Sequence, residues 1–214
     1  MKTEAIAIEA YKYFSGLEGN RNIASEYGLI SILQIVERFR VNNVLEIGLG
    51  IGSVSYSVLR HCKMNNKDIT YVGTETNEFC LTALPLYLNA FYENIKIYKG
   101  LAAVSGCEKF NMVIIDGQDE NLHKIVSLVS RHGIVIIEGD RQPQLELVRS
   151  LFPQSVYTRI ISNRKHPDYG PFPANGWGGG IQLIFVHPTF SQKLYFWKQR
   201  ILTSIKYKMR SIKS

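Results

Sequence analysis

The chain has 214 residues, of which 45% are hydrophobic and 20% charged, a composition typical of a soluble globular protein with one buried core. No stretch approaches the roughly 20 apolar residues of a membrane-spanning helix. The N-terminal segment carries Glu4 and Glu9 in place of the apolar core of a signal peptide, which predicts a cytoplasmic protein. The cysteines Cys62, Cys80 and Cys107 form no C-x-x-C pair, so we expect neither a disulfide framework nor a thiolate zinc site.

The formal net charge of +7 is concentrated at the end of the chain. Residues 189–214 contain seven basic residues and no acidic one, so the remaining residues carry no net charge. The apolar residues of this tail recur every three or four positions, as in an amphipathic helix: Leu194, Trp197, Ile201, Ile205, Met209 and Ile212. Three uses fit this pattern: contact with an anionic membrane surface, which would make the protein peripheral to the membrane, docking on the domain or on a second subunit of a homodimer, and, least favoured, nucleic-acid binding.

In chain order, the first predicted element is an amphipathic helix on which Leu29, Ile32, Leu33 and Val36 share one face. From residue 44 onward, short β-branched runs alternate with helical patterns, which predicts a mostly parallel sheet with helices on both faces. The predicted strands are Val44–Ile47, Ile69–Gly73, Ile95–Tyr98, Met112–Ile115, Ile134–Ile137, Ser155–Ile160 and Ile181–Val186. The predicted helices among them are residues 53–62, 78–92, 119–131 and 143–151.

The last two predicted strands break this alternation. The residues between them, HPDYGPFPANGWGGG, contain no helical pattern, and such a connection is typical of an antiparallel pair. We therefore expect a helical cover at residues 1–40, an α/β domain at residues 41–188 and the basic amphipathic tail at residues 189–214.

The most informative motif runs from Glu46 to Ser53, where an apolar strand leads into Gly48, Gly50 and Gly52 and a helix follows. Glycines allow a ligand to approach the backbone closely, and the start of a helix offers free N–H groups. Dinucleotide-binding loops have the spacing G-x-G-x-x-G, but here the third glycine comes one residue earlier. An acid beside the loop would repel a pyrophosphate and suits a ligand that carries cationic groups.

This segment matches the E-x-G-x-G-x-G signature of class I methyltransferases, whose cofactor S-adenosylmethionine carries a sulfonium and an ammonium group. The chain resembles that family over residues 25–187, which implies a Rossmann-like α/β sheet of seven strands, mostly parallel with a C-terminal antiparallel hairpin. Glu75 ends the second predicted strand and matches the family's ribose-binding acid. The candidate cofactor-binding residues are Glu46, Gly48, Gly50, Gly52, Ser53, Glu75, Thr76, Leu101, Ala102 and Asp116.

Acids also follow the fourth and fifth predicted strands, where ligands of open α/β sheets lie. Here the chain resembles the bacterial small-molecule O-methyltransferases of the catechol and caffeoyl-CoA types, in which acids at these positions hold a divalent cation. The resemblance implies Asp116, Glu138 and Asp140 as candidate ligands of Mg²⁺, although Gly139 stands where the family has Asn or Asp. The alternatives are a metal-free general base at Asp116 and plain helix capping.

A second candidate for proton abstraction is His166, in the loop between the last two predicted strands, and the alternative is an exposed histidine without a catalytic role. The motif of amino-group methyltransferases that act on nucleic acid bases is missing after the fourth strand, which favours an oxygen acceptor. The sequence therefore predicts an enzyme that methylates a hydroxyl of a small molecule or a glycan. Two alternatives remain: an NAD-type Rossmann dehydrogenase, which the glycine spacing disfavours, and a non-catalytic binding protein with a methyltransferase fold.

Overall fold

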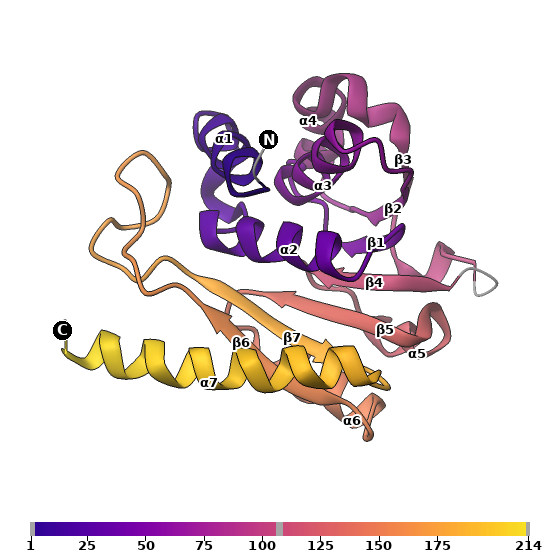
Figure 1. Ribbon diagram of the computed structural model, residues 1–214. Coiled ribbons are helices and arrows are strands. Elements are labelled where there is room, and N and C mark those ends of the chain that lie inside the picture. The colour runs from indigo at the N-terminus through magenta and orange to yellow at the C-terminus, as the bar shows by residue number, and fades with distance from the viewer. Residues whose placement is uncertain (1–2, 106–108, 213–214) are drawn as a thin grey trace.

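The computed structural model describes residues 3–105 and 109–212 and contains a seven-stranded sheet with the strand order β3-β2-β1-β4-β5-β7-β6 (Figure 1). Strands β1 to β5 pair in parallel, and β7 is antiparallel to both of its neighbours. This confirms the predicted sheet and its C-terminal hairpin. The strands are β1 (Asn43–Ile47), β2 (Thr70–Thr74), β3 (Ile95–Tyr98), β4 (Phe110–Ile115), β5 (Val129–Glu138), β6 (Val156–Ile161) and β7 (Gly180–Phe185).

Helices cover both faces of the sheet, as predicted. Helices α1 to α4 lie on one face, α5 and α6 lie on the other, and α7 runs along the edge strand β6 (Figure 1). The helices are α1 (Thr3–Ser15), α2 (Glu26–Arg38), α3 (Ser53–Met64), α4 (Glu78–Leu88), α5 (Ile125–Leu128), α6 (Gln142–Leu151) and α7 (Phe190–Ile212).

The central strands are apolar on both sides because each side packs against a helical layer. In β4, Met112 and Ile114 join the core beneath α2 and α3, whereas Val113 and Ile115 join the core beneath α5 and α6. This alternation explains why the sequence of β4 is almost continuously hydrophobic. The free thiols Cys62 and Cys80 form no disulfide, and Cys107 lies outside the described residues.

Two predicted helices are longer in the sequence pattern than in the structure. The prediction for residues 119–131 is wrong at both ends, because the α-helix spans only Ile125–Leu128 after a 3-10 turn. Val129 already pairs with Phe110 of β4 and begins the ten-residue strand β5. The helix predicted for residues 78–92 ends at Leu88, since Asn89 takes a positive φ of 49° and a 3-10 turn follows. In both cases tertiary packing or a turn ends a helix that the hydrophobic pattern alone would extend.

Helix α7 covers the edge of the sheet with polar side chains. The Thr203 hydroxyl donates to the carbonyl oxygen of Arg159 at 2.5 Å, and the Lys206 ammonium donates to that of Ile161 at 2.8 Å. These carbonyl oxygens belong to β6, which has no further strand beside it. The helix thereby blocks an exposed strand edge that would otherwise be open to pairing with other chains.

Three aromatic rings connect the sheet to this helix. Phe185 of β7 packs edge-on against Phe39 with ring centroids 5.3 Å apart, and Tyr195 of α7 meets both rings. Phe185 is fully buried, so its ring links α2, the sheet and α7 without contact with water.

We expect Phe185→Ala to lower the free energy of unfolding by about 3–5 kcal/mol, because it removes a buried ring from a packed cluster. Urea denaturation measures the change, and an unaltered m-value would show that the folded state stays compact. The matched control is Leu86→Ala on the exposed side of α4, which should change stability by less than about 0.5 kcal/mol. Equal effects of the two substitutions would contradict the packing described here.

Candidate functional site

The glycine loop between β1 and α3 has a backbone that side chains would disturb. Gly48, Gly50 and Gly52 all have positive φ, at 84°, 54° and 97°. A Cβ on Gly48 would lie 2.5 Å from the Cα of Gly117, so the loops after β1 and β4 touch backbone to backbone. Gly52 is the N-cap of α3, and the first turn of that helix leaves N–H groups without intrahelical partners.

Glu75 holds the glycine loop in place. Its Oε2 accepts a hydrogen bond from the Gly50 N–H at 2.7 Å, and its Oε1 accepts from the N–H groups of Thr76 and Asn77, both at 2.8 Å. A carboxylate offers about four lone-pair sites, so Glu75 retains acceptor capacity for hydroxyl groups of a ligand.

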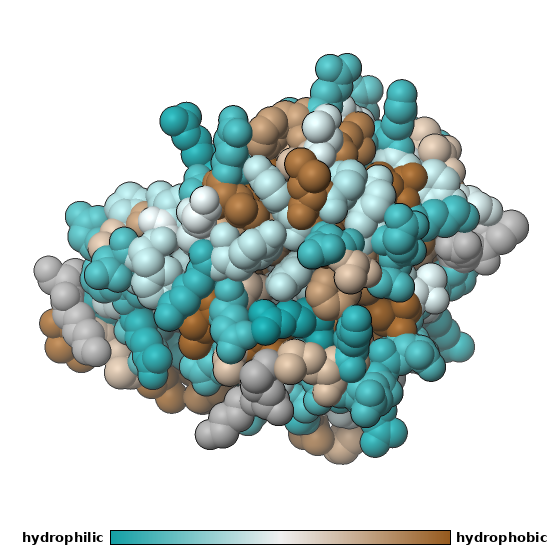
Figure 2. Space-filling model, turned by 90° about the horizontal axis from the view of Figure 1, so that it is seen from above, coloured by the Kyte–Doolittle hydropathy of each residue, from teal (hydrophilic) through white to brown (hydrophobic). Residues whose placement is uncertain are grey.

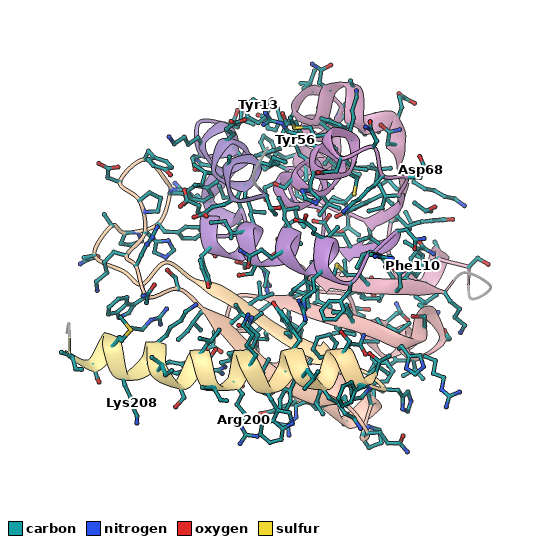
Figure 3. The ribbon with its side chains drawn as sticks, in the orientation of Figure 1. Tyr13, Tyr56, Asp68, Phe110, Arg200 and Lys208 are labelled. Carbon is teal, nitrogen blue, oxygen red and sulfur yellow. The ribbon has the colours of Figure 1, made fainter. Side chains whose placement is uncertain are left out.

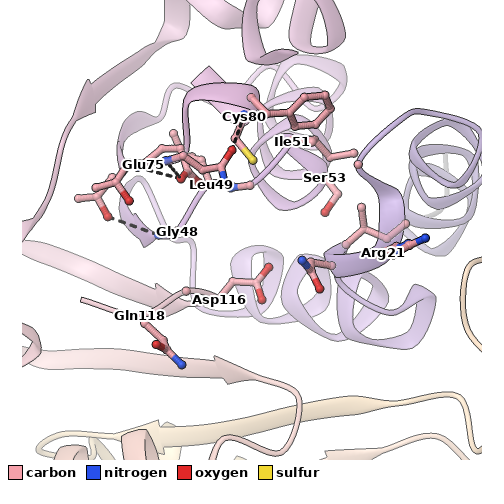
Figure 4. Close-up of a pocket in the computed structure, with 18 of the residues that line it drawn as sticks. Arg21, Gly48, Leu49, Ile51, Ser53, Glu75, Cys80, Asp116 and Gln118 are labelled. Atoms are coloured by element: carbon pink, nitrogen blue, oxygen red, sulfur yellow. Dashed lines mark hydrogen bonds between the residues drawn. The ribbon is translucent and has the colours of Figure 1, made fainter. Parts of the chain in front are cut away.

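A cavity of about 910 Å³ lies over this loop, and Figure 4 shows Glu75 and Arg21 on opposite sides of it with Asp116 between them. Its volume is in the range of small-molecule and cofactor sites. Of the predicted site residues, the cavity brings together Gly48, Gly50, Ser53, Glu75, Thr76 and Asp116.

Other predicted cofactor residues lie outside this lining. A Cβ on Gly52 would point toward the Leu88 side chain, at 2.8 Å, so that this glycine faces α4. Leu101 is buried and donates its N–H to Asp119 Oδ2 at 2.8 Å, while Ala102 lines an adjoining hollow.

Glu46 lies inside the core instead of at the cavity. The side chains of β1 alternate between the two faces, and Glu46 shares a face with Val44, where Tyr71 of β2 donates its hydroxyl to Oε2 at 2.5 Å. Burial raises the pKa of the Glu46 carboxyl well above its ordinary value, although the hydrogen bond from Tyr71 opposes this. The neutral form is therefore favoured, and the acids that line the cavity are Glu18, Glu75, Asp116 and Asp119.

Asp116 follows β4 and is bridged to the end of β5 by Arg141. The guanidinium donates to Asp116 Oδ1 at 3.1 Å, to the Asp116 carbonyl oxygen at 2.6 Å and, through Nε, to the carbonyl oxygen of Glu138 at 3.1 Å. Burial raises the pKa of Asp116 well above its ordinary value and the nearby Glu138 carboxyl adds to this, whereas Arg141 opposes it. The carboxylate is thus a stronger base than that of an exposed aspartate.

The three candidate metal ligands point to different partners. Glu138 Oε1 accepts from the N–H of Ser25 at 3.1 Å, at the start of α2, and Asp140 is exposed and pairs with Arg159 at 3.3 Å. Within residues 3–105 and 109–212, no three or more His, Cys, Asp or Glu side chains are grouped to hold a metal ion. This donor set does not fit Mg²⁺, and a guanidinium lies between the two strand ends where the resemblance implied a cation.

His166 is apart from the cavity. Its ring packs on Phe172 with centroids 4.8 Å apart, within the long loop between β6 and β7, and burial lowers its pKa. Of the two predicted catalytic residues, Asp116 lines the cavity and His166 does not.

Several lining residues had no sequence signal. The connection between α1 and α2 covers the cavity with Asn20, Arg21 and Asn22, and the Ser53 hydroxyl accepts from the Ala24 N–H at 3.4 Å. These polar residues precede the glycine motif by some 30 positions and read as an ordinary loop. Arg141, by contrast, directly follows the acids after the fifth strand, and a cation next to paired acids was a signal that sequence reasoning could have used.

The strand order with its reversed last strand, together with the glycine loop after β1, defines the class I methyltransferase fold. Among solved structures, an O-methyltransferase from Bacillus cereus in complex with S-adenosylhomocysteine is similar with a TM-score of 0.58 and 14% identity, covering 85% of this chain and 90% of that one. TomG, an O-methyltransferase from Streptomyces achromogenes in complex with S-adenosylmethionine, is similar with a TM-score of 0.53 and 17% identity, covering 87% and 90%.

A third similar structure is the methyltransferase PaMTH1 from Podospora anserina bound to S-adenosylhomocysteine, with a TM-score of 0.55 and 13% identity over 85% of this chain and 87% of that one. No protein-family model matches the sequence, and no curated protein is significantly similar to it. At these identities the similarity establishes the fold.

Two glycine substitutions test the close contact between the loops. Gly48→Ala should destabilise the protein by more than Gly50→Ala, because its Cβ meets the backbone of Gly117 while a Cβ on Gly50 meets nothing within 4 Å. Both substitutions carry the left-handed backbone penalty of about 1–2 kcal/mol, so Gly50→Ala is the matched control. Urea denaturation compares them, and equal losses of stability would show that the two loops can separate freely.

The buried carboxyl of Glu46 predicts a pH dependence. Its raised pKa means that the folded protein keeps a proton that the unfolded chain releases, so stability should fall as pH rises above about 4.3, the ordinary pKa of Glu, up to the raised pKa. Asp116 and Glu138 act in the same direction. Glu46→Gln should therefore reduce this slope by up to about 1.4 kcal/mol per pH unit.

Urea unfolding at a series of pH values measures the slope, with the exposed position Glu120→Gln as control. A slope that Glu46→Gln leaves unchanged would show that the Glu46 carboxyl is ionised in the folded protein.

Proposed function

We propose that this chain is an S-adenosylmethionine-dependent methyltransferase that acts on a hydroxyl of a small molecule or a glycan. The observation that carries the proposal is the single cavity in which Glu75, the glycine loop and Asp116 meet. The similar structures bound to S-adenosylmethionine or S-adenosylhomocysteine support the same cofactor class.

The residues of the cavity fit this cofactor. Glu75 would accept hydrogen bonds from the ribose hydroxyls, while the first turn of α3 at Ser53 would donate to the carboxylate of the amino-acid part. When bound, the cofactor would supply an electrophilic methyl group, carried on a sulfonium, for transfer to an oxygen of the acceptor. Glu46 is not part of this set, because its carboxyl bonds to Tyr71 inside the core.

Asp116 is the proposed general base. It lines the cavity between the Glu75 side and the Arg21 side, and its raised pKa suits it to take the proton of a hydroxyl group as that oxygen reacts. Arg141 would keep the carboxylate oriented through its hydrogen bond to Oδ1. We derive no step through a metal ion, because Glu138 and Asp140 are engaged elsewhere.

The side of the cavity opposite Glu75 favours a polar acceptor. Asn20, Arg21 and Asn22 line it beside Glu18. The Asn20 amide donates to the carbonyl oxygen of Ser15, so the groups that would donate to hydroxyl, carboxylate or phosphate oxygens of an acceptor are those of Arg21 and Asn22. An acceptor of this class has one hydroxyl that is methylated and other oxygen atoms that accept hydrogen bonds from the protein. This description fits a sugar or a hydroxy acid better than a purely aromatic compound.

Calorimetry and a methyl-transfer assay test the proposal in two stages. We expect binding of S-adenosylmethionine and S-adenosylhomocysteine but not of NAD, and Glu75→Gln should weaken cofactor binding about tenfold to hundredfold through lost charge-assisted hydrogen bonds. The control is Glu78→Gln, an exposed acid three residues away that does not line the cavity. Binding of NAD in place of S-adenosylmethionine would contradict the cofactor assignment.

In the second stage, transfer of a labelled methyl group is measured on a panel of hydroxylated acceptors with and without EDTA. Asp116→Asn should reduce turnover by about 10²-fold or more and leave cofactor affinity nearly unchanged, while EDTA should have no effect. Cofactor binding without transfer to any acceptor would favour the non-catalytic alternative, and unaltered turnover of Asp116→Asn would exclude this residue as the base.

A further inference from the structure

Helix α7 has an outer face that the fold leaves uncovered. Its inner face packs Tyr195 and Phe196 into the core and bonds Thr203 and Lys206 to the edge of the sheet. The outer face carries large apolar side chains that are exposed to solvent: Phe190, Leu194, Trp197, Ile201, Ile205 and Ile212. The exposed fraction is 77% for Phe190 and 59% for Ile201, so these side chains contribute little to the core.

These residues form one line along the helix, because they follow one another at helical spacing. From Phe190 to Ile212 the line is about 33 Å long at 1.5 Å rise per residue. Exposed apolar residues are normal when scattered, whereas a continuous patch indicates an interaction surface. By contrast, the surface over α1, α3 and α4 is mostly hydrophilic, with apolar side chains interspersed among polar ones (Figure 2).

Cationic side chains flank this apolar line, and one of them, Lys208, lies on the line itself between Ile205 and Ile212. Lys193, Lys198, Arg200 and Lys208 are exposed, and Figure 3 shows Arg200 and Lys208 projecting from α7 away from the sheet. The other basic residues of the described helix, Lys206 and Arg210, turn inward to the carbonyl oxygens of Ile161 and Ser162. No acidic residue occurs between residues 189 and 214, so every charged side chain on the outer face is cationic.

We propose that the outer face of α7 binds the surface of an anionic lipid bilayer, with the helix lying in the plane of the interface. There the apolar line would enter the acyl boundary while the flanking cations meet lipid headgroups. None of the helices in the described parts of the chain is long and apolar enough to cross a membrane.

A second copy of the chain is a poorer occupant, because two such faces would bring lysines and arginines against one another with no acid to pair them. Nucleic acid is also a poorer occupant, since phosphates would pair the cations but leave Ile201, Ile205 and Leu194 without an apolar phase. Of these three occupants, the lipid interface alone satisfies both kinds of side chain.

The bound helix would set the loop between β6 and β7 beside the headgroups. The Arg210 guanidinium donates to the carbonyl oxygen of Ser162 and stacks over the Trp177 ring at 4.9 Å, which ties the C-terminal part of α7 to both ends of that loop. Binding does not depend on the proposed methyl transfer, so it is tested without any activity assay.

Co-sedimentation of the full chain with vesicles tests the proposal. We expect binding to vesicles of phosphatidylcholine and phosphatidylglycerol in equal parts, and much weaker binding to phosphatidylcholine alone. The variant Leu194→Ser/Ile201→Ser/Ile205→Ser removes three side chains of the apolar line and should lower the partition coefficient about tenfold or more. The variant Lys193→Gln/Lys198→Gln/Arg200→Gln/Lys208→Gln removes four cations and should lower the partition coefficient by roughly 600-fold, at about fivefold for each charge.

The matched control removes four lysines from other parts of the surface and leaves α7 intact: Lys12→Gln/Lys63→Gln/Lys67→Gln/Lys124→Gln. This control has the same net charge as the cation variant and should bind like the original chain. Circular dichroism checks that all variants are folded. Equal losses in the control and the cation variant would overturn the proposal, because the attraction would then be unspecific.

Fluorescence gives a second, local measurement, since the chain has only two tryptophans and Trp197 belongs to the apolar line. In a Trp177→Phe background, emission of Trp197 should shift to the blue when anionic vesicles are added. An unshifted spectrum with bound protein would overturn the proposed orientation. A stable dimer in sedimentation equilibrium that Ile201→Ser dissociates would assign the face to a second copy, and tighter binding to duplex RNA than to vesicles would assign it to nucleic acid; either result overturns the lipid assignment.

Discussion

The backbone contact between Gly48 and Gly117 is the constraint on which the site depends. The chain builds β1, β2 and β3 outward in one direction and then returns to place β4 and β5 on the other side of β1. The loops after β1 and β4 therefore depart in opposite directions, and a crevice opens at their common point, as expected at such a topological switch. Because the two loops touch without side chains between them, Glu75 and Asp116 can face one cavity from the ends of β2 and β4, the strands on either side of β1.

Local sequence signals predicted the parts of the site that a single segment encodes. The glycines after β1 indicate a turn that requires positive φ, and Glu75 directly follows an apolar run. The glycine loop and this acid were therefore identifiable from the residues themselves. The position of Glu46 was not predictable in this way. Whether its side chain reaches the cavity depends on the face of β1 from which it projects, and the motif does not indicate that face. Alternation along β1 places it on the buried face where the Tyr71 hydroxyl donates to it, and burial there favours the neutral acid.

The cavity-lining residues that the sequence did not predict belong to segments distant from the glycine motif. Arg21 reaches the cavity only because α1 and α2 pack over α3, and nothing within the loop around it indicates a ligand. Arg141 shows a further limit of inference from resemblance: acids at strand ends imply a metal only if their oxygens converge. Here the guanidinium joins Asp116 to the backbone of β5, and a fixed organic cation thereby neutralises the carboxylate that a divalent ion would otherwise bind.

The same reasoning applies to the last helix, because its hydrophobic pattern alone does not say which face is inside. An amphipathic helix that docks on a domain usually buries its apolar stripe, but α7 contacts an edge strand whose unpaired carbonyl oxygens require donors. Its inner face must therefore supply hydroxyl, ammonium and guanidinium groups over its C-terminal half. The apolar residues at the remaining positions of the helix then face outward as a consequence, and they form the exposed apolar line.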